Sequence, residues 1–419
     1  MTGAAVIVGA SHAGVQAALS LRQSGWQDEI VLFSAETDHP YHRPPLSKAF
    51  LAGEKDAGQI LLRAPELYRD QQIDLRLGEP VEAIDHAGRF VTSKTGRQPY
   101  STLLLATGSR ARRLAAPGAD LDGVFTLRSL RDSRAIKDAL AAAGSVVIVG
   151  GGFIGLEVAS TSAKLGRKTT VLEALPTLLS RALPPAVGDF LRSYHEGKGV
   201  RFRFGAQVAG FEGEGGRLRA VRLADGSTIA AEVALVGIGG EADLDLAKDL
   251  GLRLSAGGIE VDAHGRTSVE GIYAMGDVAG FQNAFAPAPM RLESVQNAVD
   301  QAKAAAAHIC GGDAGLTAVP WFWTDQYDLK VQMAGIGRPG AVEILRGDPS
   351  TGAFTLLQLV DGRLIAAHSV NRAADHMMAR RLIADRVPID VAAAADAATP
   401  LAKAVLAEAT TSRMATAGP

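Results

Sequence analysis

A glycine-rich run in the second quarter of the chain has the spacing of a dinucleotide-binding turn. The run Gly150-Gly151-Gly152-Phe153-Ile154-Gly155 follows an apolar stretch, Val146 to Val149, and precedes a helical pattern. Gly150 permits a tight turn, Gly152 lets the backbone approach a pyrophosphate, and Gly155 lets helix and strand pack closely. The run therefore predicts a nucleotide site that includes Phe153 and Ile154.

A carboxylate at the end of the next apolar stretch completes this pattern. Glu173 stands about 20 residues after the turn, where such sites carry an acidic residue that accepts from the ribose hydroxyls. The same carboxylate would repel a 2′-phosphate, and no arginine follows it directly. The pattern favours NADH over NADPH. The alternative is a structural glycine turn beside a solvated Glu173.

A second run of the same kind opens the chain, Gly9-Ala10-Ser11-His12-Ala13-Gly14. Ser11 replaces the usual middle glycine, but it is small enough to leave the phosphate approach open. We predict a second dinucleotide site formed by Gly9, Ser11, His12, Ala13 and Gly14. Glu36 is the favoured ribose ligand, ahead of Glu29 and Asp38, although alone it would pass for a surface loop residue.

A third signal is the run Thr267 to Asp277, in which a short strand pattern delivers an aspartate behind a glycine, Gly276. Ligands of open α/β sheets bind at the carboxyl ends of the strands. Asp277 is therefore predicted to hydrogen-bond a ribityl hydroxyl, with Gly276 leaving room for the cofactor chain.

The elements that must position these residues form two strand-turn-helix-strand units and a later region of antiparallel strands. The fold class predicted is α/β, with two Rossmann-like dinucleotide-binding domains and a C-terminal α+β domain. The first domain is interrupted by the second. The predicted bounds are 1–112 and 243–317 for the first dinucleotide-binding domain, 113–242 for the second and 318–419 for the C-terminal domain.

Composition excludes several other classes of protein. The 419 residues carry a formal net charge of -2, with both signs interspersed, so neither nucleic acid nor an anionic membrane is predicted as a partner. The chain enters a strand pattern almost at once and has no apolar stretch long enough to span a membrane, which favours a cytoplasmic protein. Spacing indicates no metal site.

The single cysteine and the histidines are predicted to be structural. Cys310 has no partner for an internal disulfide and is expected to be a small buried hydrophobe. Loop or surface positions are expected for six of the histidines, namely His39, His42, His195, His308, His368 and His376.

Taken together, these motifs resemble the pyridine-nucleotide flavoprotein reductases of the glutathione-reductase structural class, and within it the ferredoxin reductases of oxygenase systems. The resemblance covers nearly the whole chain and implies that the first dinucleotide-binding domain binds FAD and the second binds NAD. It is carried by the two glycine runs and by Arg43 to Lys48, Ala106-Thr107-Gly108, Gly276-Asp277, Arg291 to Val295 and Pro320 to Gln326.

The resemblance implies that Arg43, Pro44 and Lys48 lie along the flavin, with Lys48 near the N5 edge and paired with Glu157. An ammonium there would stabilise a reduced flavin, and a buried Glu157 would need such a partner. The alternative places both on solvated faces. The same likeness brings further residues to the flavin, namely Ala106, Thr107, Gly108, Glu293, Ser294 and Val295. The helix that begins at Val295 would meet the pyrimidine end.

Trp323 is implied to approach the flavin ring and the electron exit. Aromatic core packing explains Trp321 and Trp323 equally well.

Relatives that reduce disulfides or peroxides need cysteines in the early part of the first domain, where this chain has Pro44 to Lys48 instead, and Cys310 lies far away in sequence. The resemblance therefore implies FAD and NADH as cofactors and an external acceptor, a [2Fe-2S] ferredoxin that supplies a cytochrome P-450 or a ring-hydroxylating dioxygenase. The alternatives are an NADH:rubredoxin reductase or diaphorase, and an NADH-responsive flavoprotein of the apoptosis-inducing-factor type. A monomer or weak homodimer is expected. Such ferredoxins are acidic, so a docking patch of Arg63, Arg291 and Lys303 is predicted.

Overall fold

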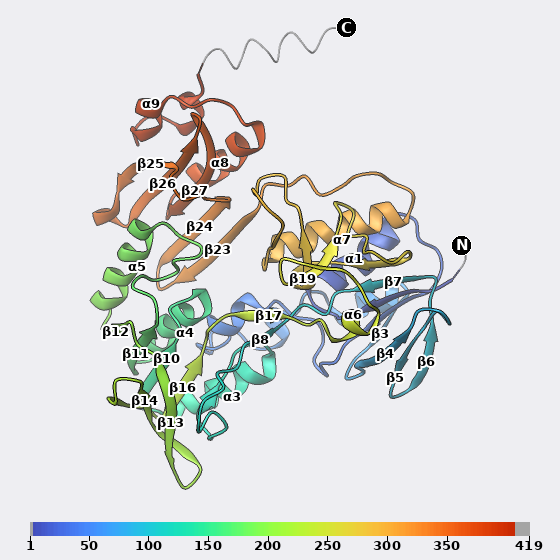
Figure 1. Cartoon of the computed structure of the whole chain (residues 1–419), viewed down its shortest axis with the longest axis horizontal. Coiled ribbons are helices and arrows are strands. Elements are labelled where there is room, and N and C mark those ends of the chain that lie inside the picture. The colour runs from blue at the N-terminus through green and yellow to red at the C-terminus, as the bar shows by residue number, and fades with distance from the viewer. Residues whose placement is uncertain (1–2, 407–419) are drawn as a thin grey trace. The chain divides into compact units, whose positions relative to one another are not determined.

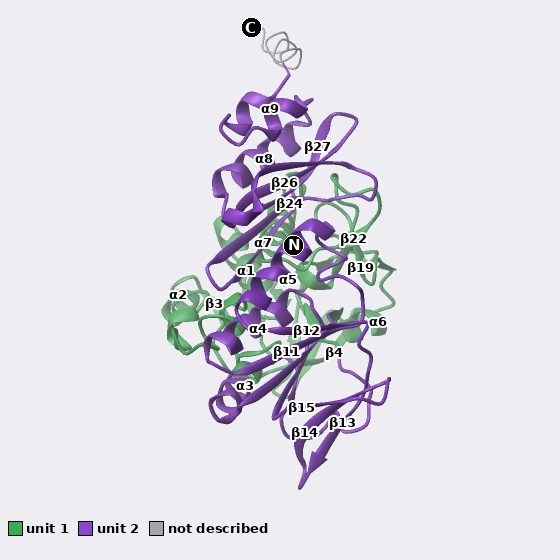
Figure 2. Ribbon diagram, turned by 90° about the vertical axis from the view of Figure 1, so that its left-hand side faces the viewer, with its two compact units in different colours: residues 1–112, 128–133, 240–318 green, residues 113–127, 134–239, 319–419 purple. Residues whose placement is uncertain are grey.

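The computed structural model describes residues 3–406. These residues fall into two compact units, shown in different colours in Figure 2. Unit 1 comprises residues 1–112, 128–133 and 240–318, and unit 2 comprises residues 113–127, 134–239 and 319–419. The three-domain division drawn from the sequence remains a prediction.

Unit 1 is built on a five-stranded parallel sheet in the order β20-β7-β1-β2-β3. In that order, its strands are Ile272–Ala274, Thr102–Leu105, Ala5–Val8, Ile30–Phe33 and Ile73–Arg76. The central strands β1 and β2 are buried at every position, as expected of parallel strands covered on both faces. Helices α1 (His12–Gln23) and α7 (Val295–Ile309) lie side by side and share one apolar cluster with the sheet (Figure 1).

Smaller elements complete unit 1. An antiparallel sheet consists of β4 (Val81–Asp85), β5 (Phe90–Ser93) and β6 (Gly96–Pro99). Two further sheets contain β8 (Ser109–Ala111) with β17 (Gly240–Ala242), and β18 (Leu254–Ser255), β19 (Gly258–Val261), β21 (Ala279–Phe281) and β22 (Met290–Arg291). The short helices are α2 (Pro65–Asp70) and α6 (Asp245–Asp249).

Unit 2 contains a second parallel sheet, in the order β12-β11-β10-β16-β9. In that order, its strands are Arg201–Phe204, Lys168–Glu173, Ser145–Val149, Val233–Val236 and Val124–Phe125. Its helices are α4 (Phe153–Lys164) and α5 (Pro185–Gly197), and helix α3 (Leu130–Ala142) runs into it from residues 130–133 of unit 1. An antiparallel sheet of β13 (Val208–Glu214), β14 (Arg217–Leu223) and β15 (Thr228–Ala230) follows.

The later part of unit 2 is an antiparallel sheet in the order β23-β24-β27-β26-β25. In that order, its strands are Trp321–Gln326, Leu329–Gly335, Arg363–Val370, Ala353–Val360 and Val342–Asp348. Helix α8 (Ala373–Asp385) packs on this sheet. The sequence predicts strands at residues 330–336, 342–346, 354–359 and 364–370 and a helix at residues 373–384, which correspond to four of these strands and to α8. It predicts no strand at β23. That strand mixes aromatic and polar side chains on both faces, so its sequence shows no simple alternation of polarity.

The C-terminal tail differs in part from expectation. One helix is predicted from Val391, and α9 spans only Val391–Ala395, followed by a 3-10 turn at Leu401–Ala404. The loose end predicted beyond these elements lies outside the described residues.

Two expectations about single residues were wrong. His195, His368 and His376 are buried in unit 2 rather than placed in loops or on the surface. Cys310 is only partly buried, because it caps the C-terminal end of α7 and packs at the edge of the cluster below α1.

Within residues 3–406, no helix is long and apolar enough to cross a membrane, and no group of three or more His, Cys, Asp or Glu side chains is arranged to hold a metal ion.

Candidate functional site

The first glycine run forms a tight turn between β1 and α1. Gly9 has φ of +109°, and a Cβ on it would lie 2.2 Å from the carbonyl oxygen of Ala106. A Cβ on Gly14 would lie 1.9 Å from the carbonyl oxygen of Gly9. Only glycine fits either position. The turn therefore brings the start of α1 against the end of β7, where Ala106, Thr107 and Gly108 follow.

Arg43 lies beside this turn and gathers polar groups from several segments. It stands directly before the 3-10 turn Pro44–Ser47, whose end is capped by Lys48. Its guanidinium donates to the Oγ of Ser11 at 3.1 Å, to a carboxylate oxygen of Glu36 at 2.7 Å and to the backbone oxygen of Arg128 at 2.7 Å. Ser11, which departs from the glycine pattern, is thus hydrogen-bonded to Arg43, the residue that the resemblance implies along the flavin.

Glu36 is held from two sides. Besides Arg43, the phenol of Tyr41 donates to it at 2.5 Å. Burial raises the pKa of Tyr41 above its usual value, so the phenol stays protonated and remains a donor. The Glu36 side chain is still 32% exposed, which leaves an oxygen lone pair available to a further donor such as a ribose hydroxyl.

Asp277 is anchored at the end of β20 in a second polar cluster of unit 1. Its Oδ2 accepts from the Oγ of Ser109 and from Arg128, each at 3.0 Å. Gly276 before it has φ of +77°, and its backbone N–H donates to Gln301 of α7 at 2.8 Å. Ser109 and Arg128 are absent from the sequence prediction, because no motif marks them and only the fold brings them to the aspartate.

His12 and His42 form a ring pair in the same unit, with centroids 5.5 Å apart. Burial, with help from the neighbouring His42 and Arg43 side chains, lowers the pKa of His12 to about 3, so the ring is neutral. Its Nε2 is buried and has no hydrogen-bond partner among the described residues.

The segment around the start of α7 contains the three residues that the resemblance implies at the flavin, Glu293, Ser294 and Val295. Ser294 caps the helix, its Oγ accepting from the backbone N–H of Asn297 at 3.1 Å, and Val295 begins the first turn. Glu293 is paired with Arg291 at 2.6 Å. The Arg291 side chain is only 15% exposed and also donates to the backbone oxygen of Asp277. Arg291 is therefore a poor docking residue, because its charge is already paired and largely covered.

The second glycine run forms the equivalent turn in unit 2. Gly150 has φ of +107°, and a Cβ on it would lie 2.5 Å from the backbone oxygen of Gly237. A Cβ on Gly155 would lie 2.1 Å from the backbone oxygen of Gly150. The Glu173 carboxylate accepts from the backbone N–H groups of Gly151 at 2.7 Å and Leu175 at 2.8 Å. The acidic residue predicted to read the ribose thus lies at the turn itself.

Both turns suit the phosphates of a dinucleotide. Ser11 and Gly152 stand at the N-termini of α1 and α4, and neither helix has a side-chain cap there. The free N–H groups of a helix start bind anions. A Cβ on Gly152 would find its nearest neighbour 3.9 Å away, so space remains in front of α4. The open helix starts and the unpartnered Nε2 of His12 fit bound dinucleotides.

Strand β23 presents two different faces in unit 2. Trp321 and Trp323 share one face, with rings 5.5 Å apart, and Arg380 lies over Trp321. On the other face Phe322 contacts Phe153.

Thr324, on the same face as Phe322, donates to Glu157 at 2.6 Å. Glu157 is thus a buried residue of α4 that contacts the C-terminal sheet. Its predicted pair with Lys48 would join the two units and remains a prediction.

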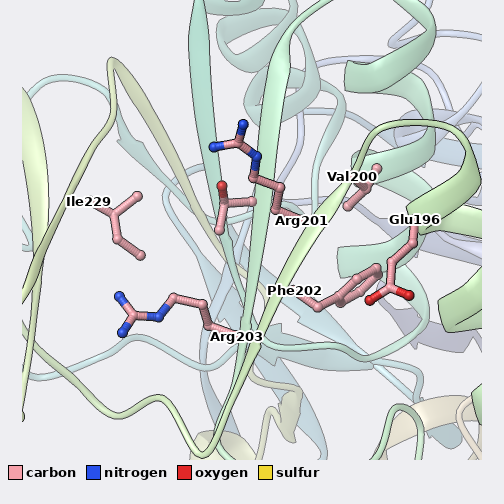
Figure 3. A pocket seen from close by; sticks show the side chains of 7 residues that line it. Glu196, Val200, Arg201, Phe202, Arg203 and Ile229 are labelled. Atoms are coloured by element: carbon pink, nitrogen blue, oxygen red, sulfur yellow. The ribbon is translucent and has the colours of Figure 1, made fainter.

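A shallow groove of about 500 Å³ lies on unit 2 beside the edge strand β12. Figure 3 shows Arg201 and Arg203 projecting from this strand, with Ile229 on the opposite wall. None of the predicted site residues lines it.

Comparison with known proteins identifies the family. The family model described as pyridine nucleotide-disulphide oxidoreductase matches residues 3–302, and the one described as reductase C-terminal matches residues 321–405. The 5,5'-dehydrodivanillate O-demethylase ferredoxin reductase subunit of Sphingobium sp. is 42% identical, over 96% of this chain and 98% of its own length. The rubredoxin-NAD(+) reductase of Pseudomonas putida is 39% identical, over 88% of this chain and 96% of its own length.

A solved structure agrees with these matches over the whole chain. The covalent complex of putidaredoxin reductase with putidaredoxin matches with a TM-score of 0.93 and 36% identity, and the match covers 99% of each chain. The chain belongs to the pyridine nucleotide-disulphide oxidoreductase family, as an FAD- and NAD(H)-dependent oxidoreductase with the reductase C-terminal domain.

Proposed function

We propose that this chain passes electrons from NADH, through bound FAD, to a [2Fe-2S] ferredoxin that supplies an oxygenase. The observation that carries the proposal is the full-length similarity to reductases whose names specify a ferredoxin partner, together with the absence of a second cysteine. FAD supplies the step between a two-electron donor and a one-electron acceptor. The protein supplies binding, orientation and exclusion of water.

The position of Cys310 supports an external acceptor. Its sulfur lies 4.0 Å from the backbone oxygen of Leu21, near the C-terminal end of α1. Leu21 is nine residues beyond His12, and a helix rises about 1.5 Å per residue, so the thiol lies roughly 14 Å along α1 from the glycine turn. Burial also raises its pKa, which disfavours the thiolate. This cysteine is poorly placed to take electrons at the first cofactor site.

Different residues of the chain would bind different parts of FAD and NADH. The two helix starts behind Gly9 and Gly150 would hold the pyrophosphates of FAD and NADH. Glu36 and Glu173 would accept from ribose hydroxyls, and Asp277, fixed by Arg128 and Ser109, would accept from the cofactor chain. Lys48 and Glu157 would flank the reacting ring, and Trp323 the electron exit.

The partner surface is proposed on unit 1. Arg63 and Lys303 are exposed, whereas Arg291 is withdrawn by its pairing with Glu293. Arg63→Glu with Lys303→Glu should raise the apparent KM for ferredoxin at low salt without changing flavin reduction by NADH. An unchanged apparent KM for ferredoxin would refute this docking patch. The cytoplasmic location and the monomeric or weakly dimeric state remain predictions.

Anaerobic stopped-flow mixing tests the function. The purified yellow protein is mixed with NADH and, separately, with NADPH, and the reduced protein is then mixed with an oxidised [2Fe-2S] ferredoxin. We expect rapid bleaching by NADH and stoichiometric reduction of the ferredoxin. Slow bleaching with a long-lived charge-transfer band and a dimer formed on adding NADH would replace this proposal with the NADH-responsive flavoprotein.

Rubredoxin is the second candidate acceptor, because the similarity to the rubredoxin-NAD(+) reductase also extends over most of the chain. The same experiment with rubredoxin decides between them. Faster electron transfer to rubredoxin than to any tested ferredoxin would favour this second function.

A further inference from the structure

Four buried polar side chains form a hydrogen-bonded series across unit 2. Thr324 donates to Glu157 at 2.6 Å, Gln326 donates to Thr324 at 3.2 Å, and the Nε2 of His195 lies 2.8 Å from the amide oxygen of Gln326. All four are at most 5% exposed. They come from three elements, α4, β23 and α5, and Thr324 and Gln326 lie two residues apart on one face of β23.

The chemistry of each group allows one direction along this series. Thr324 donates its single O–H to a carboxylate oxygen of Glu157. The threonine oxygen accepts from the amide nitrogen of Gln326, which turns the amide oxygen toward His195. That ring must then carry its proton on Nε2. Burial lowers the pKa of His195, so the ring is neutral, and its Nδ1 has no partner within the described part of the chain.

This series is an unusual use of core space. It borders the apolar cluster that joins α4 and α5 to the C-terminal sheet, and Phe202 and Tyr327 pack against the His195 ring. Burying polar groups there stabilises less than well-packed apolar side chains would. The hydrogen bonds of the series hold the Glu157 carboxylate, at one end, in a single orientation. A role at that end accounts for the arrangement.

We propose that Thr324, Gln326 and His195 are positioning residues that orient the Glu157 carboxylate for flavin reduction. The inference rests on the proposed function, in which Glu157 lies beside the reacting ring. His195, the last residue of the series, lies on α5 and is linked to Thr324 through Gln326. Hydrogen bonds therefore connect the core between α4, α5 and β23 to the Glu157 carboxylate.

The kinetic test uses three variants of the FAD-loaded protein. Thr324→Val keeps the shape and removes the hydroxyl, and Thr324→Ser restores it. Ser160→Ala is the matched control, because Ser160 lies one turn along α4 and accepts from the backbone N–H of Tyr327 at 2.8 Å. We expect Thr324→Val to lower the limiting rate of flavin reduction about tenfold, the effect of losing one charge-assisted hydrogen bond. The Kd for NADH should stay unchanged, and the serine variant and the control should stay within about twofold of the wild type.

A second readout follows the histidine and needs no turnover. With ¹⁵N-labelled histidine, the imidazole shifts of the holoprotein report the tautomer of His195, and a His195→Gln variant assigns its signals. We expect the Nε2–H form alone in the wild type, the serine variant and the control. Thr324→Val leaves the Gln326 amide free to flip, so the Nδ1–H form should appear as well.

The outcomes separate the alternatives. A mixed tautomer with a slowed reduction, both confined to Thr324→Val, supports the proposal. An unchanged tautomer in that variant, or a mixed tautomer with a normal rate, overturns it. An equal loss of rate in Ser160→Ala overturns it as well, since general loosening between α4 and β23 would then suffice. A wild type that NADH does not reduce refutes the proposed function, and the positioning role with it, whatever the tautomer.

Discussion

We expect the C-terminal sheet to be sensitive to acid because it buries His368. This residue lies on β27 with Met333 and Leu356 as its strand partners, and neither ring nitrogen has a hydrogen-bond partner in residues 3–406. Burial lowers the pKa of His368 from 6.5 to about 4. Below pH 6.5 the His368 imidazole therefore binds a proton in the unfolded chain, whereas in the folded chain it stays neutral until about pH 4.

The size and sign of the effect follow from proton linkage. Because the folded pKa is the lower one, the stabilising difference is fully present above pH 6.5 and is lost as the pH falls toward 4. Each pH unit in this window costs about 1.4 kcal/mol, so between pH 7 and pH 5 this one ring should cost about 2 kcal/mol.

His368→Leu tests the linkage directly. Urea unfolding is followed at pH 7 and pH 5 by the fluorescence of Trp321 and Trp323, which lie in the same sheet, in a Trp26→Phe background. The variant should lose about 2 kcal/mol less than the parent between the two pH values. His12 and His376 titrate in both proteins and cancel in the comparison. Parallel losses in parent and variant would show that His368 does not stay neutral in the folded state.

Three substitutions test the cofactor sites. Arg43→Met removes the charge-assisted hydrogen bond to Glu36, worth about 2 kcal/mol, and should weaken FAD binding roughly 30-fold by fluorescence titration. The control is Arg22→Met, which removes hydrogen bonds to several backbone oxygens elsewhere in unit 1. It should lower the stability of the protein and leave its affinity for FAD unchanged. Asp277→Ala should lose its yellow colour on extensive dialysis, and full retention would argue against the anchor. Glu173→Arg should move the preference in kcat/KM from NADH toward NADPH, whereas a variant still selective for NADH would contradict the ribose role.

Local sequence was sufficient to predict the turns, because the requirement for glycine is itself local. Gly9 and Gly150 adopt positive φ angles and lie against a neighbouring carbonyl, and both constraints leave a mark in the sequence. Glu173 could be found for the same reason, since the length of one helix and one strand sets its distance from the turn.

The partners of these residues could not be predicted, because the fold brings them from far along the chain. Arg128 reaches Asp277 and lies beside Arg43, yet its own neighbourhood carries no motif. His195 looks like a surface residue of an amphipathic helix until Gln326 is placed against it. A buried polar contact between distant segments leaves no periodic signal in either one.

The two turns differ in a way that matches two kinds of ligand. In unit 1, Arg43 lies over Ser11, and His12 behind it is buried. In unit 2, the space before Gly152 is open, and Ile154 on the first turn of α4 is 43% exposed. A resident cofactor is held best where charge and burial surround it, whereas a substrate that leaves after each turnover requires an accessible site. The surroundings of the turns, more than the glycines they share, therefore support the proposal that FAD binds at the first turn and the exchanging NADH at the second.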